Sequence, residues 1–109
     1  MKPKKVVFIE DSLEQSFSEM SDKEPLKKSL IKSIKEIKYN AFCGRNVKKK
    51  MIPKSFIDKY KLENLWICNL SSGWRLLYSL TRDEEEIKII AIVLDWMDHK
   101  DYEKLFGFN

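Results

Sequence analysis

The spacing of apolar residues divides the first third of the chain into one strand and two helices. Residues 6–9 (Val-Val-Phe-Ile) are apolar and mostly β-branched, which predicts a short strand. Apolar residues then recur at helical spacing over residues 12–20 and again over residues 23–39, where lysines occupy the opposite face. Each predicted helix starts with a capping-box pair: Ser12 with Gln15, and Ser21 with Glu24. The two helices are therefore expected to form a hairpin.

The last third of the chain has the pattern of a β-hairpin followed by a central strand. Residues 65–70 form a short apolar run, a Ser-Ser-Gly turn follows, and residues 74–80 return as the antiparallel strand. Residues 87–94 are apolar on both faces of the predicted strand, which is typical of a strand in the middle of a sheet. The acidic tip of residues 82–86 (Arg-Asp-Glu-Glu-Glu) is expected to form the turn before it. A short helix over residues 100–106 ends at a glycine, the preferred residue after a helix C-terminus.

The segment between the helical hairpin and the first hairpin strand, residues 40–61, has no clean period. Gly44, Pro53 and the run Lys48-Lys49-Lys50 indicate a long loop, and such loops often carry function. The predicted order is β-α-α-β-β-β-α in one domain of residues 1–109. This order favours an α+β fold with a small, mainly antiparallel, twisted sheet. The helical hairpin is expected on one face, the first strand beside the last long strand, and part of the other face open as a groove.

Composition narrows the class of protein. Charged residues are 35% of the chain and hydrophobic residues 43%, as in globular proteins. No apolar run approaches the ~20 residues that a membrane helix needs, and the start of the chain lacks a signal peptide, so we expect no membrane partner. Cys43 and Cys68 are expected to be reduced thiols of a cytoplasmic protein. With one histidine and two separated cysteines, the chain does not predict a metal site, and no cofactor is expected.

The net charge of +4 is unevenly distributed along the chain. Residues 38–61 carry eight basic side chains and one acid, a net charge of +7, whereas residues 62–109 have a net charge of −4. Such a concentration of lysines is typical of a surface that binds a polyanion, and equally of a solvated linker in a lysine-rich protein. The lysines that we select as candidate RNA-backbone contacts are Lys48, Lys49, Lys50, Lys54 and Lys100.

Three side chains near the ends of the predicted strands suggest chemistry on a phosphodiester. Arg75 lies inside an apolar strand, and its planar fork is suited to phosphate oxygens in a charged transition state. His99 follows the central strand and is the natural proton donor or acceptor near neutral pH. Tyr102, three residues later, is expected to share a face with it if a helix begins there. Metal-free RNA cleavage needs these functions: activation of a 2′-hydroxyl, charge stabilisation and protonation of the leaving oxygen.

Each candidate also has an ordinary structural interpretation. Arg75 would then form a salt bridge to a neighbouring strand, His99 would cap the last helix or lie under it, and Tyr102 would pack with Phe106 in the core. The three tryptophans lie in apolar runs and are expected in the core. The candidate site is crowded by acids that would repel RNA unless they face away: Asp95, Asp98, Asp101 and Glu103.

The order of these motifs resembles the RelE/ParE superfamily of type II toxin–antitoxin systems. Residues 73–78 (Gly-Trp-Arg-Leu-Leu-Tyr) resemble the aromatic-Arg-apolar-apolar-Tyr strand of that family. Residues 98–102 (Asp-His-Lys-Asp-Tyr), followed by Phe106-Gly107-Phe108, resemble its C-terminal region, and residues 52–54 (Ile-Pro-Lys) resemble a segment that precedes its hairpin. The resemblance extends over most of the chain and places the family's phosphate-binding arginine at Arg75.

The resemblance implies a compact toxin that is blocked by a cognate antitoxin protein. Members of the RelE-like branch cleave mRNA, usually in the ribosomal A site, whereas ParE-like members act on DNA gyrase and lack the nuclease residues. Our leading expectation is therefore a metal-independent endoribonuclease that acts on mRNA with the ribosome. The alternatives are a ParE-like gyrase inhibitor, a degenerate toxin that only binds an antitoxin, and a general binder of single-stranded RNA.

Overall fold

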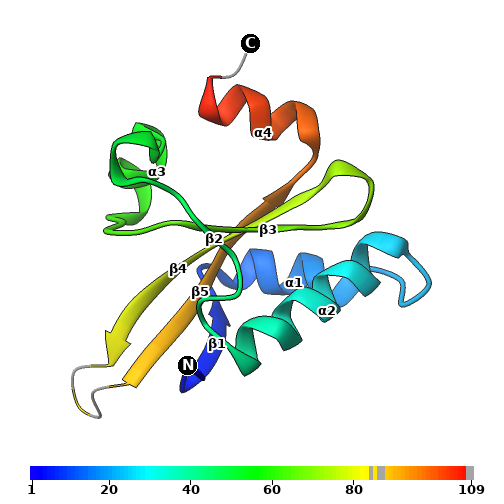
Figure 1. The fold of residues 1–109 in the computed structure, drawn as a ribbon. Helices are drawn as coiled ribbons and strands as arrows, with labels where there is room; N and C mark the ends of the chain where they lie inside the picture. Colours follow the sequence, from blue (N-terminus) through cyan, green and yellow to red (C-terminus); the bar gives the residue numbers. More distant parts are fainter. Residues whose placement is uncertain (84, 86–87, 108–109) are drawn as a thin grey trace.

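Five strands form one mixed sheet in the computed structural model, which describes residues 1–83, 85 and 88–107 (Figure 1). The strands are β1 (Lys5–Phe8), β2 (Arg45–Asn46), β3 (Trp66–Asn69), β4 (Arg75–Asp83) and β5 (Lys88–Met97). Their order in the sheet is β1-β5-β4-β3-β2. The β1–β5 pair is parallel and the other three pairs are antiparallel. The α+β class is confirmed, as is the pairing of β5 with the first strand. Strand β5 lies inside the sheet, as expected, but β4 is the middle strand of the five.

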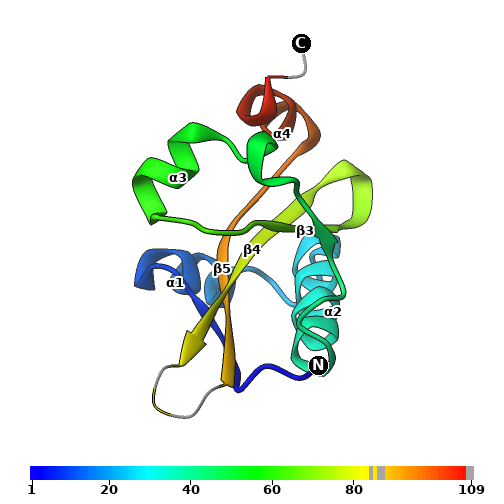
Figure 2. The same ribbon diagram turned by 60° about the vertical axis from the view of Figure 1, so that its left-hand side comes forward.

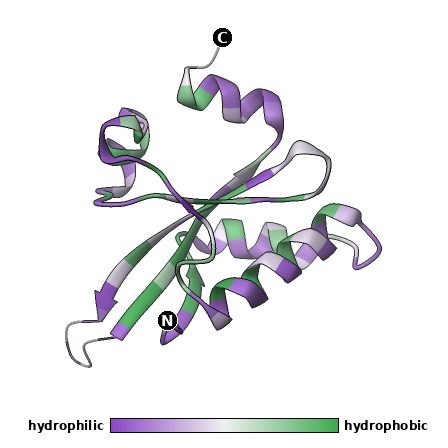
Figure 3. Ribbon diagram, in the orientation of Figure 1, coloured by the Kyte–Doolittle hydropathy of each residue, from purple (hydrophilic) through white to green (hydrophobic). Residues whose placement is uncertain are grey.

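Four α-helices cover the two faces of this sheet: α1 (Asp11–Glu19), α2 (Pro25–Tyr39), α3 (Lys54–Tyr60) and α4 (His99–Phe106). The predicted hairpin of α1 and α2 lies on one face, where Leu30 and Ile37 pack against Leu76 and Tyr78 of β4. Helices α3 and α4 lie on the other side of the sheet, as the turned view in Figure 2 shows. Hydrophobic positions follow the strands, whereas the outer side of α2 is largely hydrophilic (Figure 3).

The two predicted capping boxes are wrong. Helix α1 begins after Glu10 and α2 after Glu24, and neither N-cap side chain bonds to its helix. The Ser21 hydroxyl instead accepts a hydrogen bond from the backbone N–H of Lys23, which closes a turn between the helices. These serines satisfy the sequence rule, but Pro25 at the first position of α2 and the tight connection before it set where that helix begins.

The prediction of a long loop over residues 40–61 is also wrong. This segment contains the edge strand β2, a 3₁₀ turn at Lys49–Met51 and helix α3. Val47, Ile52 and Phe56 anchor it in the core on the second sheet face. These apolar residues are separated by five and then four positions, and α3 has only seven residues, so no single period extends through the segment.

Successive side chains of β4 point to opposite faces of the sheet and belong to two different core clusters. Leu76 and Tyr78 face α1 and α2, whereas Leu77 faces α3 and α4. Beyond Leu77 the register with β5 shifts by one residue, because Leu77 pairs with Asp95 while Tyr78 pairs with Val93. This bulge lets Leu94 and Met97, three positions apart, both reach the second cluster.

The last helix begins at His99 and ends at Gly107, whose φ of 74° is in the left-handed region that favours glycine. The predicted helix and its C-terminal glycine are confirmed. Asp98 is its N-cap and accepts a hydrogen bond from the backbone N–H of Asp101 at 2.9 Å. Of the sequence predictions made for residues 82–87 and 106–108, the parts that fall on residues 84, 86, 87 and 108 lie outside the described residues. No described helix has the length and apolar character needed to cross a membrane.

Candidate functional site

Arg75 and His99 both lie against Gly73 at one end of the sheet. The Nη1 atom of Arg75 donates to the carbonyl oxygens of Gly73 (2.7 Å) and Trp74 (3.3 Å). The Cβ of His99 lies 3.5 Å from the position that a Cβ on Gly73 would occupy. Arg75 also pairs with Met97, two residues before His99. The structure therefore brings the first two candidate residues together, and Arg75 forms no salt bridge with the described part of the chain.

Tyr102 connects Arg75 to a second arginine. Its side chain is buried, and its ring lies 5.1 Å from the guanidinium carbon of Arg75 and 4.8 Å from the ring of Phe106, measured from the ring centroid. Its hydroxyl accepts a hydrogen bond from Nη2 of Arg45 at 2.9 Å. Tyr102 is thus both a core residue that packs with Phe106 and the contact at which two guanidinium groups converge.

Arg45 was not among the residues selected from the sequence. It lies in β2, within the segment that the apolar pattern leaves as a loop, and its place depends on the pairing of β2 with β3. The one available signal is its residue type, since it is the only arginine among the basic residues of positions 38–61. Arginine binds phosphate through paired donors more readily than lysine does, so this exception was informative.

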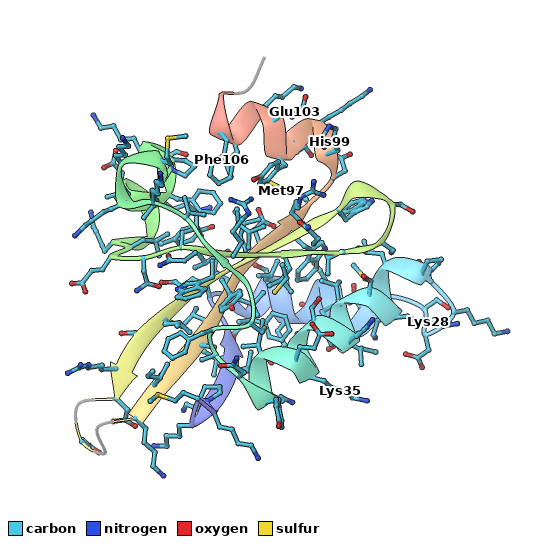
Figure 4. All side chains as sticks on the ribbon, viewed as in Figure 1. Lys28, Lys35, Met97, His99, Glu103 and Phe106 are labelled. Atoms are coloured by element: carbon cyan, nitrogen blue, oxygen red, sulfur yellow. The ribbon has the colours of Figure 1, made fainter. Side chains whose placement is uncertain are left out.

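The carboxylate partner of His99 is Glu103 and not Asp98, its neighbour in the sequence. The Nε2 atom of His99 lies 2.6 Å from Oε1 of Glu103, one helical turn further on, and both side chains are partly exposed. Asp98 is occupied as the N-cap of α4. Figure 4 shows His99 and Glu103 together on α4, with Phe106 directed toward the sheet. His99 and the buried Tyr102 therefore point to different surroundings, although the helix begins where the sequence places it.

Two of the acids around the site have partners within α4, because Asp98 caps the helix and Glu103 pairs with His99, whereas Asp101 is exposed. Asp95 is half-buried, and its Oδ1 accepts a hydrogen bond from the backbone N–H of Trp96. Burial raises the pKa of Asp95, and the nearby charges of Asp101 and Glu10 act in the same direction. The Trp96 hydrogen bond and Lys59 oppose this rise in its pKa without reversing it.

The lysines proposed to contact RNA are all exposed: Lys48, Lys49, Lys50, Lys54 and Lys100. The first three follow β2, the strand that carries Arg45, and Lys54 begins α3. Lys100 lies in the first turn of α4, next to His99. Lys48, Lys49 and Lys50 thus follow Arg45 closely in the chain, and Lys100 is the neighbour of His99. Lys54 lies on α3, whose Phe56 shares a core cluster with Tyr102.

A cavity of about 620 Å³ opens elsewhere on the molecule, over the other end of β4. Phe42, Trp66, Leu80 and Arg82 are among its lining residues, and Arg75, His99 and Tyr102 are not. The candidate site therefore lies outside this cavity. Among the described residues, no three His, Cys, Asp or Glu side chains are arranged to hold a metal ion.

Comparison with known proteins gives no relative: no protein-family model, curated protein or solved structure matches this chain. The chemistry that the site can support must therefore be argued from its own residues. Two guanidinium groups on one phenol ring offer paired donors for phosphate oxygens, and an imidazole–carboxylate pair beside them can exchange a proton.

Proposed function

We propose that this chain is a RelE-like toxin of a type II toxin–antitoxin system, an endoribonuclease that cleaves mRNA without a metal ion. It acts with the ribosome, and a cognate antitoxin neutralises it. The observation that carries this proposal is the convergence of Arg45 and Arg75 on Tyr102. His99 lies close by, because it and Arg75 both lie against Gly73. The adjacent lysines of residues 48–54 supply the attraction for a polyanion.

In this mechanism Arg75 stabilises the phosphorane. Its Nη1 is held by two backbone carbonyls, and the described residues offer no hydrogen-bond partner to its Nε and Nη2 atoms. An arginine fixed at one edge presents its other edge in a set orientation, which favours paired bonds to phosphate oxygens. The ring of Tyr102 supports the guanidinium plane from one side.

His99 and Glu103 exchange the protons of the reaction. The imidazole can protonate the leaving 5′-oxygen or accept the proton of the 2′-hydroxyl, while Glu103 orients the ring. Tyr102 is a positioning residue in this scheme, because its hydroxyl is held by Arg45 and its ring is buried. Arg45, at the edge strand, extends the phosphate-binding surface toward Lys48.

The fold agrees with this proposal. A helical hairpin follows the first strand, that strand pairs with the last one, and the arginine-bearing strand lies next to it. These features belong to the β-α-α-β-β-β-α order predicted from the sequence, to which the structure adds β2 and α3. Because folds host many activities, the fold supports the proposal only together with the site.

The proposal is tested by inducing the protein in cells and mapping new mRNA 5′ ends. The wild type is expected to arrest growth and to create cleavage sites in translated mRNA. Arg75→Ala and His99→Ala are each expected to lower cleavage by roughly 100-fold or more, as for the loss of a charge stabiliser or a general acid. Arg82→Ala is the matched control, because Arg82 is an exposed arginine of the same strand outside the site. Unchanged growth and no new 5′ ends with the wild type would exclude the nuclease.

A second candidate function is a non-enzymatic ParE-like inhibitor or a degenerate toxin that only binds an antitoxin. The observation that favours it is the short His99–Glu103 contact together with the half-buried Asp95, which place two carboxylates near a site meant for phosphate. A gyrase supercoiling assay separates the two functions. Inhibition of supercoiling by a protein that leaves mRNA intact selects this alternative.

A further inference from the structure

Helix α2 carries a row of cationic and aromatic side chains that the candidate site does not use. Its members recur at helical spacing: Lys28, Lys32, Lys35 and Tyr39. We call these four residues the α2 row. All four are exposed, and the Tyr39 side chain is 75% exposed, an unusual state for a ring at the end of an amphipathic helix. Figure 4 shows Lys28 and Lys35 on the outer side of α2.

These lysines differ from Lys27 in the same helix. Lys27 is buried, its ammonium donates to the carbonyl oxygens of Ser18 and Met20, and it lies over the ring of Phe17. Among the described residues, by contrast, no lysine of the α2 row forms an ion pair. The ammonium groups of the α2 row are therefore available to a ligand, whereas the ammonium group of Lys27 is occupied by partners within the protein.

Two hollows lie along the α2 row. One, of about 540 Å³, lies between α2 and the end of β3 and is lined by Lys28, Lys32 and Asn69 among others. The next, of about 430 Å³, is lined by Lys32, Lys35 and Tyr39 among others. Lys32 lines both hollows, so they form one path along the helix. Glu36 also lines both, and it is one acid against three lysines.

The first hollow leads toward the candidate site. It is lined by Ser71, which begins the 3₁₀ turn at Ser71–Gly73. The backbone N–H of Ser71 donates to the Ser29 hydroxyl of α2 at 2.9 Å, so the turn is tied to the helix. At the other end of this turn, Gly73 contacts both Arg75 and His99. The three residues of this 3₁₀ turn therefore connect the candidate site, at Gly73, with helix α2, at Ser71.

We propose that single-stranded RNA bound at the candidate site continues over this 3₁₀ turn and along α2. Its phosphates lie on the three lysines of the α2 row, and one base stacks on Tyr39. This inference rests on the proposed function, because it extends the path of the same RNA. From Lys28 to Tyr39 the helix rises by about 17 Å, at about 1.5 Å per residue, which is room for about three nucleotides.

The combination of residues favours single-stranded RNA over other polyanions. A duplex offers phosphates to the lysines, but its bases are stacked and leave no face open for Tyr39. Cationic grooves interleaved with exposed aromatic rings are typical of proteins that bind single strands. An acidic protein would match the lysines alone and would not use the ring of Tyr39, whose centroid lies 5.7 Å from the Lys2 ammonium.

The test measures RNA binding and not cleavage, so it is separate from the test of the nuclease. The probes are fluorescent 2′-O-methyl RNAs, which cannot be cleaved, of about 4 and about 15 nucleotides. Binding is followed by fluorescence anisotropy from about 50 to about 200 mM salt. The test variant replaces the three lysines of the α2 row by alanine, and a second variant is Tyr39→Ala. A control with the same loss of charge replaces exposed lysines that line neither hollow: Lys5, Lys23 and Lys38.

Each phosphate contact to a single strand contributes about 0.7 to the slope of log affinity against log salt, so the triple variant is expected to lose about 2 from this slope. Between about 50 and 200 mM salt, the wild type should therefore lose roughly 20-fold more affinity for the long RNA than the variant does. Tyr39→Ala should weaken binding of the long RNA by roughly tenfold. Neither variant should alter binding of the short RNA, and the control should bind like the wild type.

Several results would overturn the inference. The α2 row is not an RNA path if the triple variant keeps the wild-type salt slope, whatever the result of the cleavage test. Equal binding of a duplex of the same length, with no effect of Tyr39→Ala, would exclude single-stranded RNA as the ligand. Displacement of the long RNA by polyglutamate at matched charge would assign the row to an acidic protein instead. A wild type that binds neither RNA also overturns the inference, whereas the nuclease is decided by the mapping of mRNA 5′ ends.

Discussion

The hydroxyl of Tyr78 holds the segment that leads into β2, and Tyr78→Phe removes this hydroxyl alone. Tyr78 is completely buried in the sheet face that packs against α2. Its hydroxyl donates to the carbonyl oxygen of Ala41 and accepts from the backbone N–H of Gly44, both at 2.9 Å. Arg45 follows directly, so the same contacts set the position of the guanidinium that reaches Tyr102.

The expected cost follows from the two backbone groups that lose their partner. A buried polar group without a hydrogen bond costs about 1–3 kcal/mol. The Ala41 carbonyl belongs to a fully buried residue, whereas Gly44 is partly exposed and water can replace part of its bond. We therefore expect Tyr78→Phe to lower the free energy of unfolding by about 2–4 kcal/mol, which for a domain of this size lowers Tm by roughly 10 °C or more.

The measurement is denaturant unfolding followed by tryptophan fluorescence, with calorimetry for Tm. Tyr39→Phe is the matched control, because it removes the same atom from a ring that is 75% exposed, and its effect should stay within about 0.5 kcal/mol. If Tyr78→Phe is as mild as this control, the hydroxyl does not anchor residues 41–44, and the placement of Arg45 needs another explanation.

Three further predictions concern the surroundings of the site. Gly44→Ala should lower the free energy of unfolding by about 1–3 kcal/mol in urea, because its Cβ would lie 2.8 Å from the Tyr78 ring and hydroxyl; unchanged stability would contradict this packing. Because burial raises the pKa of Asp95, its preference for the neutral form stabilises the fold at low pH and is lost as pH rises through the folded pKa. Asp95→Asn should therefore raise Tm near pH 7 more than below about pH 4, and calorimetry showing the reverse order would contradict the burial argument. Iodoacetamide should label the exposed Cys43 rapidly, whereas Cys68, whose pKa burial raises to about 12, should react only after unfolding; equal labelling by mass spectrometry would show that Cys68 is accessible.

The elements that were predicted from the sequence are those with a long, regular repeat of apolar residues, because one complete face of each packs in the core. Helix α2 and strands β4 and β5 each contribute several residues to a core cluster, so their periods are visible in the sequence. The segment of residues 40–61 lacks this signal, because β2 has two residues and α3 has seven. Its structure depends on isolated anchors and on the hydroxyl of Tyr78, which only the assembled sheet brings into place.

The candidate site was predictable to the same extent as the elements that carry it. Arg75 and His99 follow from neighbouring strand ends, since β4 and β5 pair along most of their length. The His99–Glu103 contact was also within reach, because residues four apart face each other on a helix, as was the N-cap role of Asp98. Arg45 was not, because its position requires the register of a two-residue strand.

Two tyrosine hydroxyls on opposite faces of the sheet hold the same short segment. Tyr78 belongs to the cluster under α2 and binds residues 41 and 44, whereas Tyr102 belongs to the cluster under α4 and binds Arg45. Helix α4 therefore controls both guanidinium groups through one ring, because Tyr102 also lies against Arg75. The His99–Glu103 pair lies within α4 itself and would move with the helix as a unit. A displacement of α4 would carry Tyr102 away together with His99 and Glu103, and would break the contacts of Tyr102 with Arg45 and Arg75. The docking of α4 is therefore the contact on which the whole candidate site depends.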